Sequence, residues 1–150
     1  TGSPVEVVLD VVGWAGVGGA YTAITPTRVV DTRPATAIGS LVGPLAGRTV
    51  HAVDLGGVAG IPEGATSLVL NVTAIGPTSG GNLRVYPDVD GTGRTPPPNA
   101  SSVNYIAGRD IPNLVVVGLP ADGTVDFWSD SFGTVQLAVD VLGYLTDPVG

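Results

Sequence analysis

The sequence predicts an all-β protein, an antiparallel β-sandwich of about nine short strands. Apolar and polar residues alternate with period two in short runs that are rich in β-branched side chains. Turn residues interrupt these runs at roughly the 8–12-residue spacing of sandwich strands, and the chain of 150 residues holds 23 glycines and 13 prolines. No segment has the 3.6-residue period of an amphipathic helix, which excludes a helical fold.

The clearest strand is the closing run at residues 135–144, and an imperfect copy of it opens the chain at residues 5–14. In each copy one set of alternate residues is wholly apolar, which predicts a strand with one face in a core. The other set carries a carboxylate, Asp10 in the first copy and Asp140 in the second. The two apolar sets are Val5, Val7, Leu9 and Val11, and Val135, Leu137, Val139 and Val141.

Seven further strands are predicted between the two copies. Residues 27–33 form a short strand that Pro34 ends, and residues 35–47 form a long loop without a period. A second long loop, residues 87–100, contains Asp-Val-Asp-Gly-Thr-Gly and three consecutive prolines. The remaining strands are expected at residues 48–55, 67–75, 82–86, 102–106, 113–119 and 124–129.

The later strands follow one another as hairpins with opposed apolar faces, which favours a two-sheet sandwich of the jelly-roll or immunoglobulin-like kind. A β-trefoil and a closed barrel are the alternatives, although no threefold repeat is found. We expect one sandwich domain at residues 18–146. The N-terminal strand and its linker, residues 1–17, precede it, and a tail at residues 147–150 follows it.

The charge of the chain excludes several kinds of partner. Thirteen carboxylates and six arginines give a formal net charge of −7 at pH 7, with a pI of about 4.2. A domain this acidic repels phosphate backbones and anionic lipid, so we expect neither a nucleic-acid nor a membrane partner. The absence of cysteine excludes disulfides and thiolate metal sites.

An ordered set of motifs resembles a known domain. The motifs are Ile-Thr-Pro-Thr-Arg-Val-Val-Asp-Thr-Arg at 24–33, Leu-Asn-Val-Thr-Ala at 70–74, Leu-Arg-Val-Tyr-Pro at 83–87, Asn-Ala-Ser-Ser-Val-Asn at 99–104, Pro-Asn-Leu-Val-Val-Val at 112–117 and Val-Asp-Val-Leu-Gly-Tyr at 139–144. Together they resemble a tandem-repeat domain of secreted actinobacterial cell-surface proteins that also occurs beside cell-wall hydrolases. The resemblance implies an exported module associated with the cell envelope, without catalytic activity and without assigned site residues.

Asp88 and Asp90 form the best candidate for a metal site. Two carboxylates two residues apart in a glycine-rich turn can converge on Ca²⁺, which prefers oxygen ligands. The calcium-loop motif also needs a later acidic ligand, which is missing here, so a solvated turn is the alternative interpretation. We expect no other cofactor.

Asp126 and Trp128 form the best candidate for a ligand site. They alternate with Val125 and Phe127, which predicts that both lie on the strand face away from the core. Trp128 is therefore the candidate ring for stacking against a sugar, with Asp126 beside it. A packed edge or an interface is the alternative for a single tryptophan.

No catalytic constellation is found, and we predict that the protein is not an enzyme. The one histidine, His51, lies in a predicted strand, and no Gly-x-Ser-x-Gly elbow accompanies it. Asp31 and Arg33 are expected to lock a strand end by an ion pair. Asp140 lies opposite the core, where an arginine or a backbone N–H can satisfy it.

The duplicated strand has three explanations. Residues 5–13 belong to the sheet of their own domain, or they are the last strand of a preceding repeat, or they fill a slot in a neighbouring subunit by donor-strand complementation. The last arrangement need not close and would build a filament. We predict an extracellular structural or adhesion module of the cell surface, with itself or neighbouring repeats as partners. The alternative is a module that binds carbohydrate or cell-wall glycan beside an enzyme.

Overall fold

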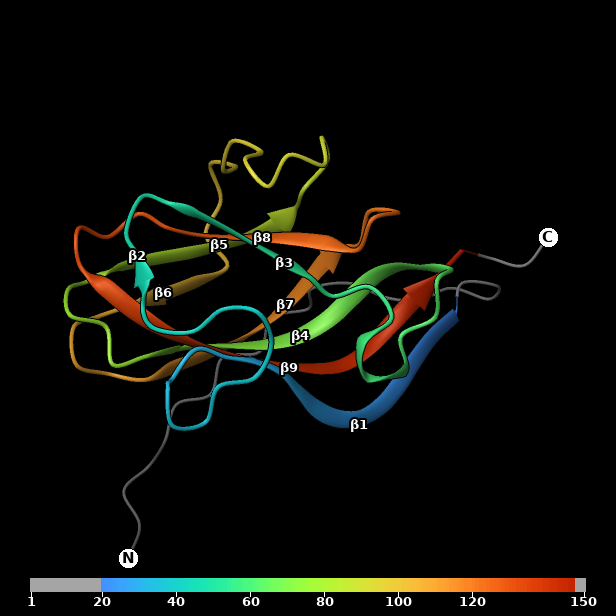
Figure 1. The fold of residues 1–150 in the computed structure, drawn as a ribbon, viewed down its shortest axis with the longest axis horizontal. Helices are drawn as coiled ribbons and strands as arrows, with labels where there is room; N and C mark the ends of the chain where they lie inside the picture. Colours follow the sequence, from blue (N-terminus) through green and yellow to red (C-terminus); the bar gives the residue numbers. More distant parts are fainter. Residues whose placement is uncertain (1–19, 148–150) are drawn as a thin grey trace, which may run out of the picture.

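Two antiparallel β-sheets packed face to face make up residues 20–147, the part of the chain that this computed structural model describes (Figure 1). The predicted all-β sandwich is confirmed, because the sheets stay separate rather than forming a barrel or a β-trefoil. The predicted strand at residues 5–14, its linker and the end of the tail lie outside the described residues. Residues 20–147 contain no helix that is long and apolar enough to span a bilayer.

The first sheet has the strand order β1-β9-β4-β7, with the short β2 paired to the start of β9, and the second has the order β3-β8-β5-β6. A single 3-10 turn, η1 (Val58–Gly60), connects β3 to β4. The strands are β1 (Ala20–Asp31), β2 (Leu45–Ala46), β3 (Val50–Asp54), β4 (Ala65–Ile75), β5 (Gly81–Pro87), β6 (Val103–Tyr105), β7 (Ile111–Gly118), β8 (Thr124–Ser129) and β9 (Thr134–Thr146).

The strands predicted between residues 27 and 144 are confirmed, with two differences in the first sheet. β1 begins at Ala20 rather than at residue 27, because its early residues pair with the end of β9. β2 lies inside the region predicted as a loop, and its two residues pair with Val135 and Thr134. A two-residue strand carries no periodic signal, so it could not be found from the sequence.

The core lies between the sheets and is built from the apolar faces that the alternation predicts. In β9 the predicted apolar set, Val135, Leu137, Val139 and Val141, is fully buried. The same holds for Leu68, Leu70, Val72 and Ala74 of β4. Phe127 of β8 is the largest of the fully buried side chains and belongs to the opposite sheet. Burial of each large apolar side chain contributes roughly 1.5–3 kcal/mol, so these faces provide most of the stability of the fold.

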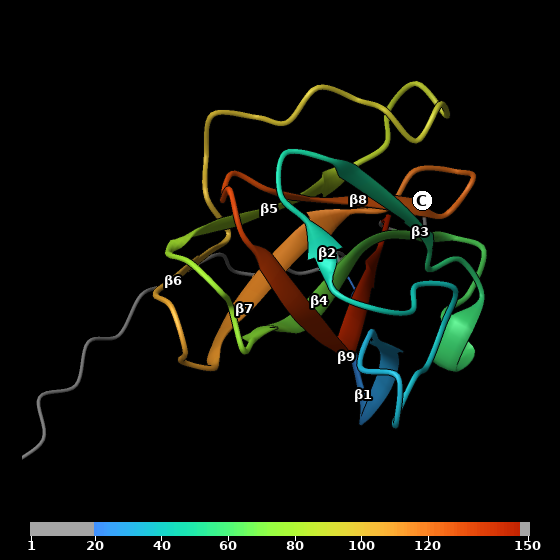
Figure 2. The ribbon, with the colours of Figure 1, turned by 60° about the vertical axis from the view of Figure 1, so that its left-hand side comes forward.

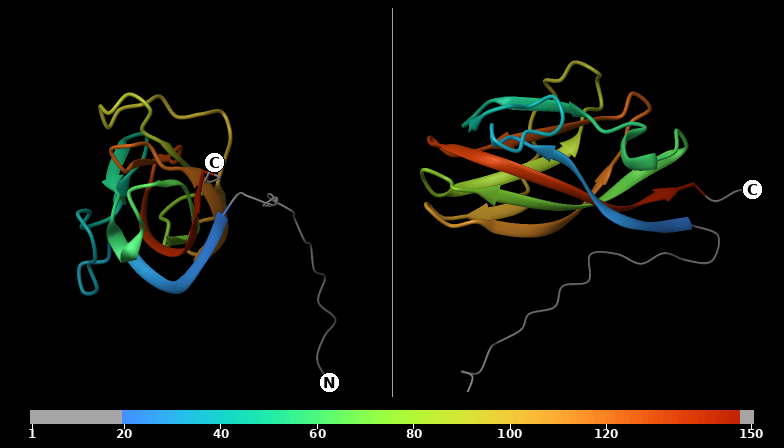
Figure 3. Two further views of the ribbon diagram at one scale, coloured as in Figure 1. Left: turned by 90° about the vertical axis from the view of Figure 1, so that its right-hand side faces the viewer. Right: turned by 60° about the horizontal axis from the view of Figure 1, so that its bottom comes forward.

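β9 is the strand around which the first sheet is arranged. It pairs with β1 on one side and with β4 on the other, as the right-hand view of Figure 3 shows. The glycine of its Gly-Tyr ending, Gly143, allows β1 to approach closely. A Cβ at this position would lie 2.5 Å from the carbonyl oxygen of Thr22, which no side chain tolerates.

The long loop after β5, residues 88–100, rises over the outer face of the second sheet. Figure 2 shows this loop, in yellow, above β5, β8 and β3. A Cβ at Gly93 would lie 3.1 Å from the Cβ of Ala52 in β3, so the loop contacts the sheet that it covers. This covered face carries both of the ligand-site residues predicted from the sequence.

Candidate functional site

Asp126 and Trp128 lie on the outer face of β8, as the alternation predicted. Val125 and Phe127 between and beside them are fully buried in the core. The pairing of β8 with β3 and β5 sets out two cross-strand rows on this face. In one row Asp126 lies between Ala52 and Tyr86, and in the other Trp128 lies between Val50 and Arg84.

Trp128 is half-buried rather than free to stack on a ligand. The guanidinium carbon of Arg84 lies 4.6 Å from the centre of its ring, in cation–π geometry. Arg84 also donates to the carbonyl oxygen of Pro98 at 2.7 Å, which ties the far end of the covering loop to the sheet. A sugar stacking on this face of the ring would have to displace Arg84.

Asp126 is fully buried, and both of its carboxylate oxygens lack a hydrogen-bond partner. The face of β8 on which Asp126 lies was predicted correctly from the alternation, but its cover by residues 88–98 was not predicted. Tyr86, its neighbour in the row, is also buried and donates to the carbonyl oxygen of Thr95 at 2.9 Å. The loop therefore closes directly over Asp126, which excludes it from contact with a ligand in solvent.

Asp88 and Asp90, the predicted calcium ligands, help to shape this loop. Asp88 is buried, and its two oxygens accept hydrogen bonds from Thr95 Oγ1 and from the backbone N–H of Gly93, each at 2.6 Å. Asp90 accepts from the side chain and the backbone of Thr92, and these bonds lower its pKa. Within residues 20–147 no three His, Asp or Glu side chains are arranged to hold a metal ion, so the geometry adds no support to the calcium prediction.

The carboxyl group of Asp126 is the electrostatic outlier of the site. Burial, together with the nearby carboxylates of Asp88, Asp90 and Asp122, raises its pKa to about 6, while the backbone N–H of Thr95 acts in the opposite direction. Burial and the same acidic surroundings raise the pKa of Tyr86 to about 12, so this phenol stays neutral. The closed loop thus holds several acidic groups around one carboxyl group, whose nearest donor, the backbone N–H of Thr95, makes no hydrogen bond of ordinary geometry with it.

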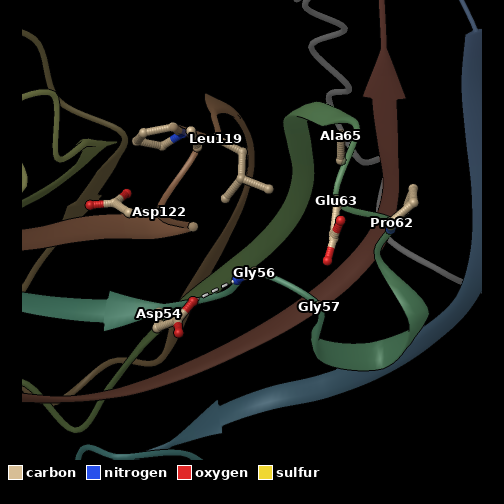
Figure 4. A pocket seen from close by; sticks show the side chains of 11 residues that line it. Asp54, Gly56, Gly57, Pro62, Glu63, Ala65, Leu119 and Asp122 are labelled. Atoms are coloured by element: carbon tan, nitrogen blue, oxygen red, sulfur yellow. Dashed lines mark hydrogen bonds between the residues drawn. The ribbon is translucent and has the colours of Figure 1, made fainter.

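An open pocket of about 400 Å³ lies near this cluster, between the loop after β3, the start of β4 and the turn from β7 to β8 (Figure 4). Three carboxylates line it, those of Asp54, Glu63 and Asp122, and no basic side chain does. Asp54 accepts from the backbone N–H of Gly56 at 2.8 Å, as the dashed line in Figure 4 marks. This pocket could not be predicted from the sequence, because three separate segments form it. Its chemistry suits a cationic group.

The Asp31–Arg33 lock predicted at the end of β1 is confirmed and is larger than expected. Asp31 is buried and accepts from Arg33 Nη2 at 2.7 Å and from Thr36 Oγ1 at 3.0 Å. The hydrogen bonds from Arg33 hold the pKa of Asp31 well below its usual range. Arg28 bridges from Asp31 to Asp140 of β9, which confirms that an arginine satisfies Asp140. The network has a structural role.

Replacing Asp31 by asparagine is expected to lower the free energy of unfolding by about 2 kcal/mol at pH 7, because charge-assisted hydrogen bonds are lost. Because folding lowers the pKa of Asp31, the carboxylate stabilises the folded state at pH values above 3.8, its ordinary pKa. This stabilisation is lost as the pH falls further. The difference between native protein and Asp31→Asn should therefore shrink as the pH falls below about 4. Urea unfolding at pH 7 and at a pH below 4 measures this difference, and the exposed Asp110→Asn is the control. A difference that persists in acid would contradict the electrostatic origin.

His51 has no partner that would make it a catalytic base. Its ring nitrogen lies 3.4 Å from the carbonyl oxygen of Ala46, and no acid or hydroxyl group of residues 20–147 bonds it. Asp10, the other carboxylate flanked by apolar residues, lies outside the described residues. The described part of the chain therefore brings together no nucleophile, base and orienting group.

The open edge of β7 is the second candidate surface. All eight residues of β7 pair with β4 without a register shift, and no described strand pairs with its other edge. The strand has no charged residue, and Leu114 and Val116 are exposed, at 44% and 47%. Long, regular and apolar edges are the ones that pair with other chains.

The other edge strands carry features that oppose pairing, and β2 has only two residues. β1 has two register shifts against β9 and contains Pro26. β3 ends in Asp54 and contains His51, and β6 has only three residues. Among the described edge strands, β7 alone combines eight residues with no charge and no register shift, and its one proline, Pro112, lies near its start.

No protein-family model matches this chain, and a search of curated proteins finds no relative. Neither result supports or contradicts the resemblance to the actinobacterial repeat domain.

Proposed function

We propose that this chain is a non-catalytic structural or adhesion module of the cell surface, and that it assembles by strand addition. The strand at residues 5–13 of one copy pairs with the open edge of β7 in the next copy. The observation that carries the proposal is the long, uncharged β7 edge, with which no described strand pairs, in a chain whose sequence contains a duplicate of its own central strand. The cell-surface location rests on the resemblance of the ordered motifs.

The position of β9 favours an edge over an internal slot. β9 pairs on both sides and its apolar set is fully buried, so its place in the sheet is filled by the chain itself. A copy of this strand from another subunit would have to unfold that sheet to enter it. Addition at a free edge needs no such step and gains backbone hydrogen bonds, as in β-augmentation.

The side chains of the two strands are compatible. In β7, Val115 and Val117 point into the core, and Leu114 and Val116 are exposed on the other face. The alternate apolar residues of 5–13 would extend the core row. Val8 and Val12 of the other set would extend the row of Leu114 and Val116. An added strand would cover apolar surface on both faces of the edge.

Replacing Val116 by lysine in the full chain is expected to abolish assembly, because lysine on an edge strand opposes strand addition and interrupts the apolar row that Val8 and Val12 would extend. Light scattering and negative-stain imaging should show regular particles for the native protein and a mass near 14.9 kDa for Val116→Lys. Removal of residues 1–17 should have the same effect as the substitution. Val116 is half exposed, so the fold and its unfolding midpoint should change little.

The matched control is Thr25→Lys, which places the same charge on an exposed residue of the β1 edge. This variant should assemble like the native protein. A native protein that stays monomeric at high concentration, or particles that persist after removal of residues 1–17, would overturn the proposal.

The alternative, a carbohydrate-binding module, has less support. Arg84 covers the ring of Trp128, and Asp126 lies beneath the loop. A sugar platform needs exposed rings in one plane, and the outer face of β8 offers one half-buried ring.

A further inference from the structure

The loop over the second sheet closes on a carboxyl group that nothing in the described structure neutralises. Asp126 is fully buried, and its two oxygens are the only buried side-chain polar atoms of residues 20–147 without a partner. Ionisation of the carboxyl group in this position is unfavourable, because it has lost water and makes no hydrogen bond of ordinary geometry, with the backbone N–H of Thr95 as its one nearby donor. The closed loop is therefore compatible with a neutral Asp126.

Asp88, in the same cover, has the hydrogen bonds that Asp126 lacks. Its two oxygens accept from Thr95 Oγ1 and from the Gly93 N–H, each at 2.6 Å. Asp88 is itself almost fully buried. A proton on Asp126 removes the charge from the buried carboxyl group that makes no hydrogen bond.

The groups around Asp126 reinforce this assignment. Asp88 and Asp90 face it from the loop, and Asp122 faces it from the turn between β7 and β8. On β5 its neighbour is Tyr86, which is neutral, and on β3 it is Ala52. No group that shifts the pKa of Asp126 is basic. Arg84 on the same face of β5 lies over the ring of Trp128 instead.

We propose that residues 88–98 form an acid-closed cover over the outer face of the second sheet. The cover is shut while Asp126 holds a proton, and it opens when Asp126 ionises. Three contacts carry the closure: Tyr86 with Thr95, Arg84 with Pro98, and Thr95 with Asp88. Opening exposes the row of Asp126 and Tyr86 and releases the ring of Trp128 from the arginine that the loop anchors.

The pH at which the cover opens depends on the surroundings of the Asp126 carboxyl group. Burial and the neighbouring acids raise the pKa of Asp126 to about 6. The cover is therefore closed in mildly acidic solution and opens as the pH rises through neutrality. An open loop restores water to Asp126 and returns its pKa toward the ordinary value of 3.8, which couples the two events.

Amide hydrogen exchange of residues 88–98 in the full chain tests this, measured at pH 5 and pH 8 and corrected for the intrinsic rates. The protection of the Gly93 amide, which donates to Asp88, should fall at least about tenfold between the two pH values. The carboxyl carbon of Asp126, observed by NMR, should titrate with the same midpoint. Asp126→Asn keeps the shape of the neutral acid and should stay protected at both pH values.

The matched control is Asp110→Asn, which removes an exposed carboxylate whose one described bond is to the Gly76 N–H, away from the loop. It should keep the native midpoint. Protection that is independent of pH in the native protein, or equally dependent in Asp126→Asn, overturns the proposal. Full protection at pH 8 on addition of Ca²⁺ to the native protein would also overturn it, since a cation and not a proton would then balance the charge.

Discussion

The Asp126→Asn variant is expected to be more stable than the native protein at pH 8, by about 1–3 kcal/mol, and equally stable at pH 4. In the native protein the pKa of Asp126 rises from 3.8 in the unfolded chain to about 6 in the folded chain. The folded state therefore binds the proton more tightly, and its stability falls as the pH rises from about 4 to above 6. Asparagine has the shape of the neutral acid and does not ionise, so this loss is absent.

Urea unfolding of both proteins at pH 4, 6 and 8 measures this difference. Other carboxyl groups, such as Asp31 with its lowered pKa, titrate equally in both proteins and cancel. Tyr86→Phe provides a useful comparison, because it removes the bond from the loop to β5 without changing a charge at these pH values. It should lower stability at every pH. A stability gain of Asp126→Asn that is the same at pH 4 and pH 8 would indicate packing rather than charge.

Phe127→Ala is expected to lower the free energy of unfolding by about 3–5 kcal/mol, the largest effect of any substitution proposed for this chain. Phe127 is fully buried between the two sheets, and its removal leaves a cavity lined by residues of both. Small domains are stable by only about 5–15 kcal/mol, so this variant should be close to unfolded at 37 °C.

The chain contains a matched control for this substitution. Phe132 is 87% exposed, and the guanidinium carbon of Arg48 lies 4.0 Å from the centre of its ring. Phe132→Ala removes the same atoms but should cost less than about 1 kcal/mol. Thermal and urea unfolding compare the two variants. Similar losses for both would mean that the two-sheet core does not depend on Phe127.

The two proposals for this protein, assembly and the opening of residues 88–98, concern different surfaces. Assembly uses the edge of β7 in the first sheet, and the cover lies on the outer face of the second sheet. Val116→Lys should therefore leave the pH dependence of the loop unchanged, and Asp126→Asn should leave assembly unchanged. Each proposal can fail without the other.

The sequence alone determined most of the strands, all but β2 and the start of β1, and which of their faces are buried. The apolar set of β9 and that of β4 could be identified from period two, because the strand geometry that sends alternate side chains to opposite faces is local. The role of Asp140 also followed from the alternation, and that of Asp31 followed from its place beside Arg33 at a strand end. The predicted faces of Asp126 and Trp128 were correct for the same reason.

Only the tertiary structure decided what covers those faces and which edge stays open. Asp126 is buried by Thr95 and Tyr86, which belong to other segments, so its alternation pattern could not distinguish an exposed site from a covered one. The pocket beside Asp122 and the free edge of β7 likewise depend on the order of the strands. Side-chain period is set within one strand, whereas strand order and loop closure are set by contacts between residues far apart in the chain, which leave no periodic trace in the sequence.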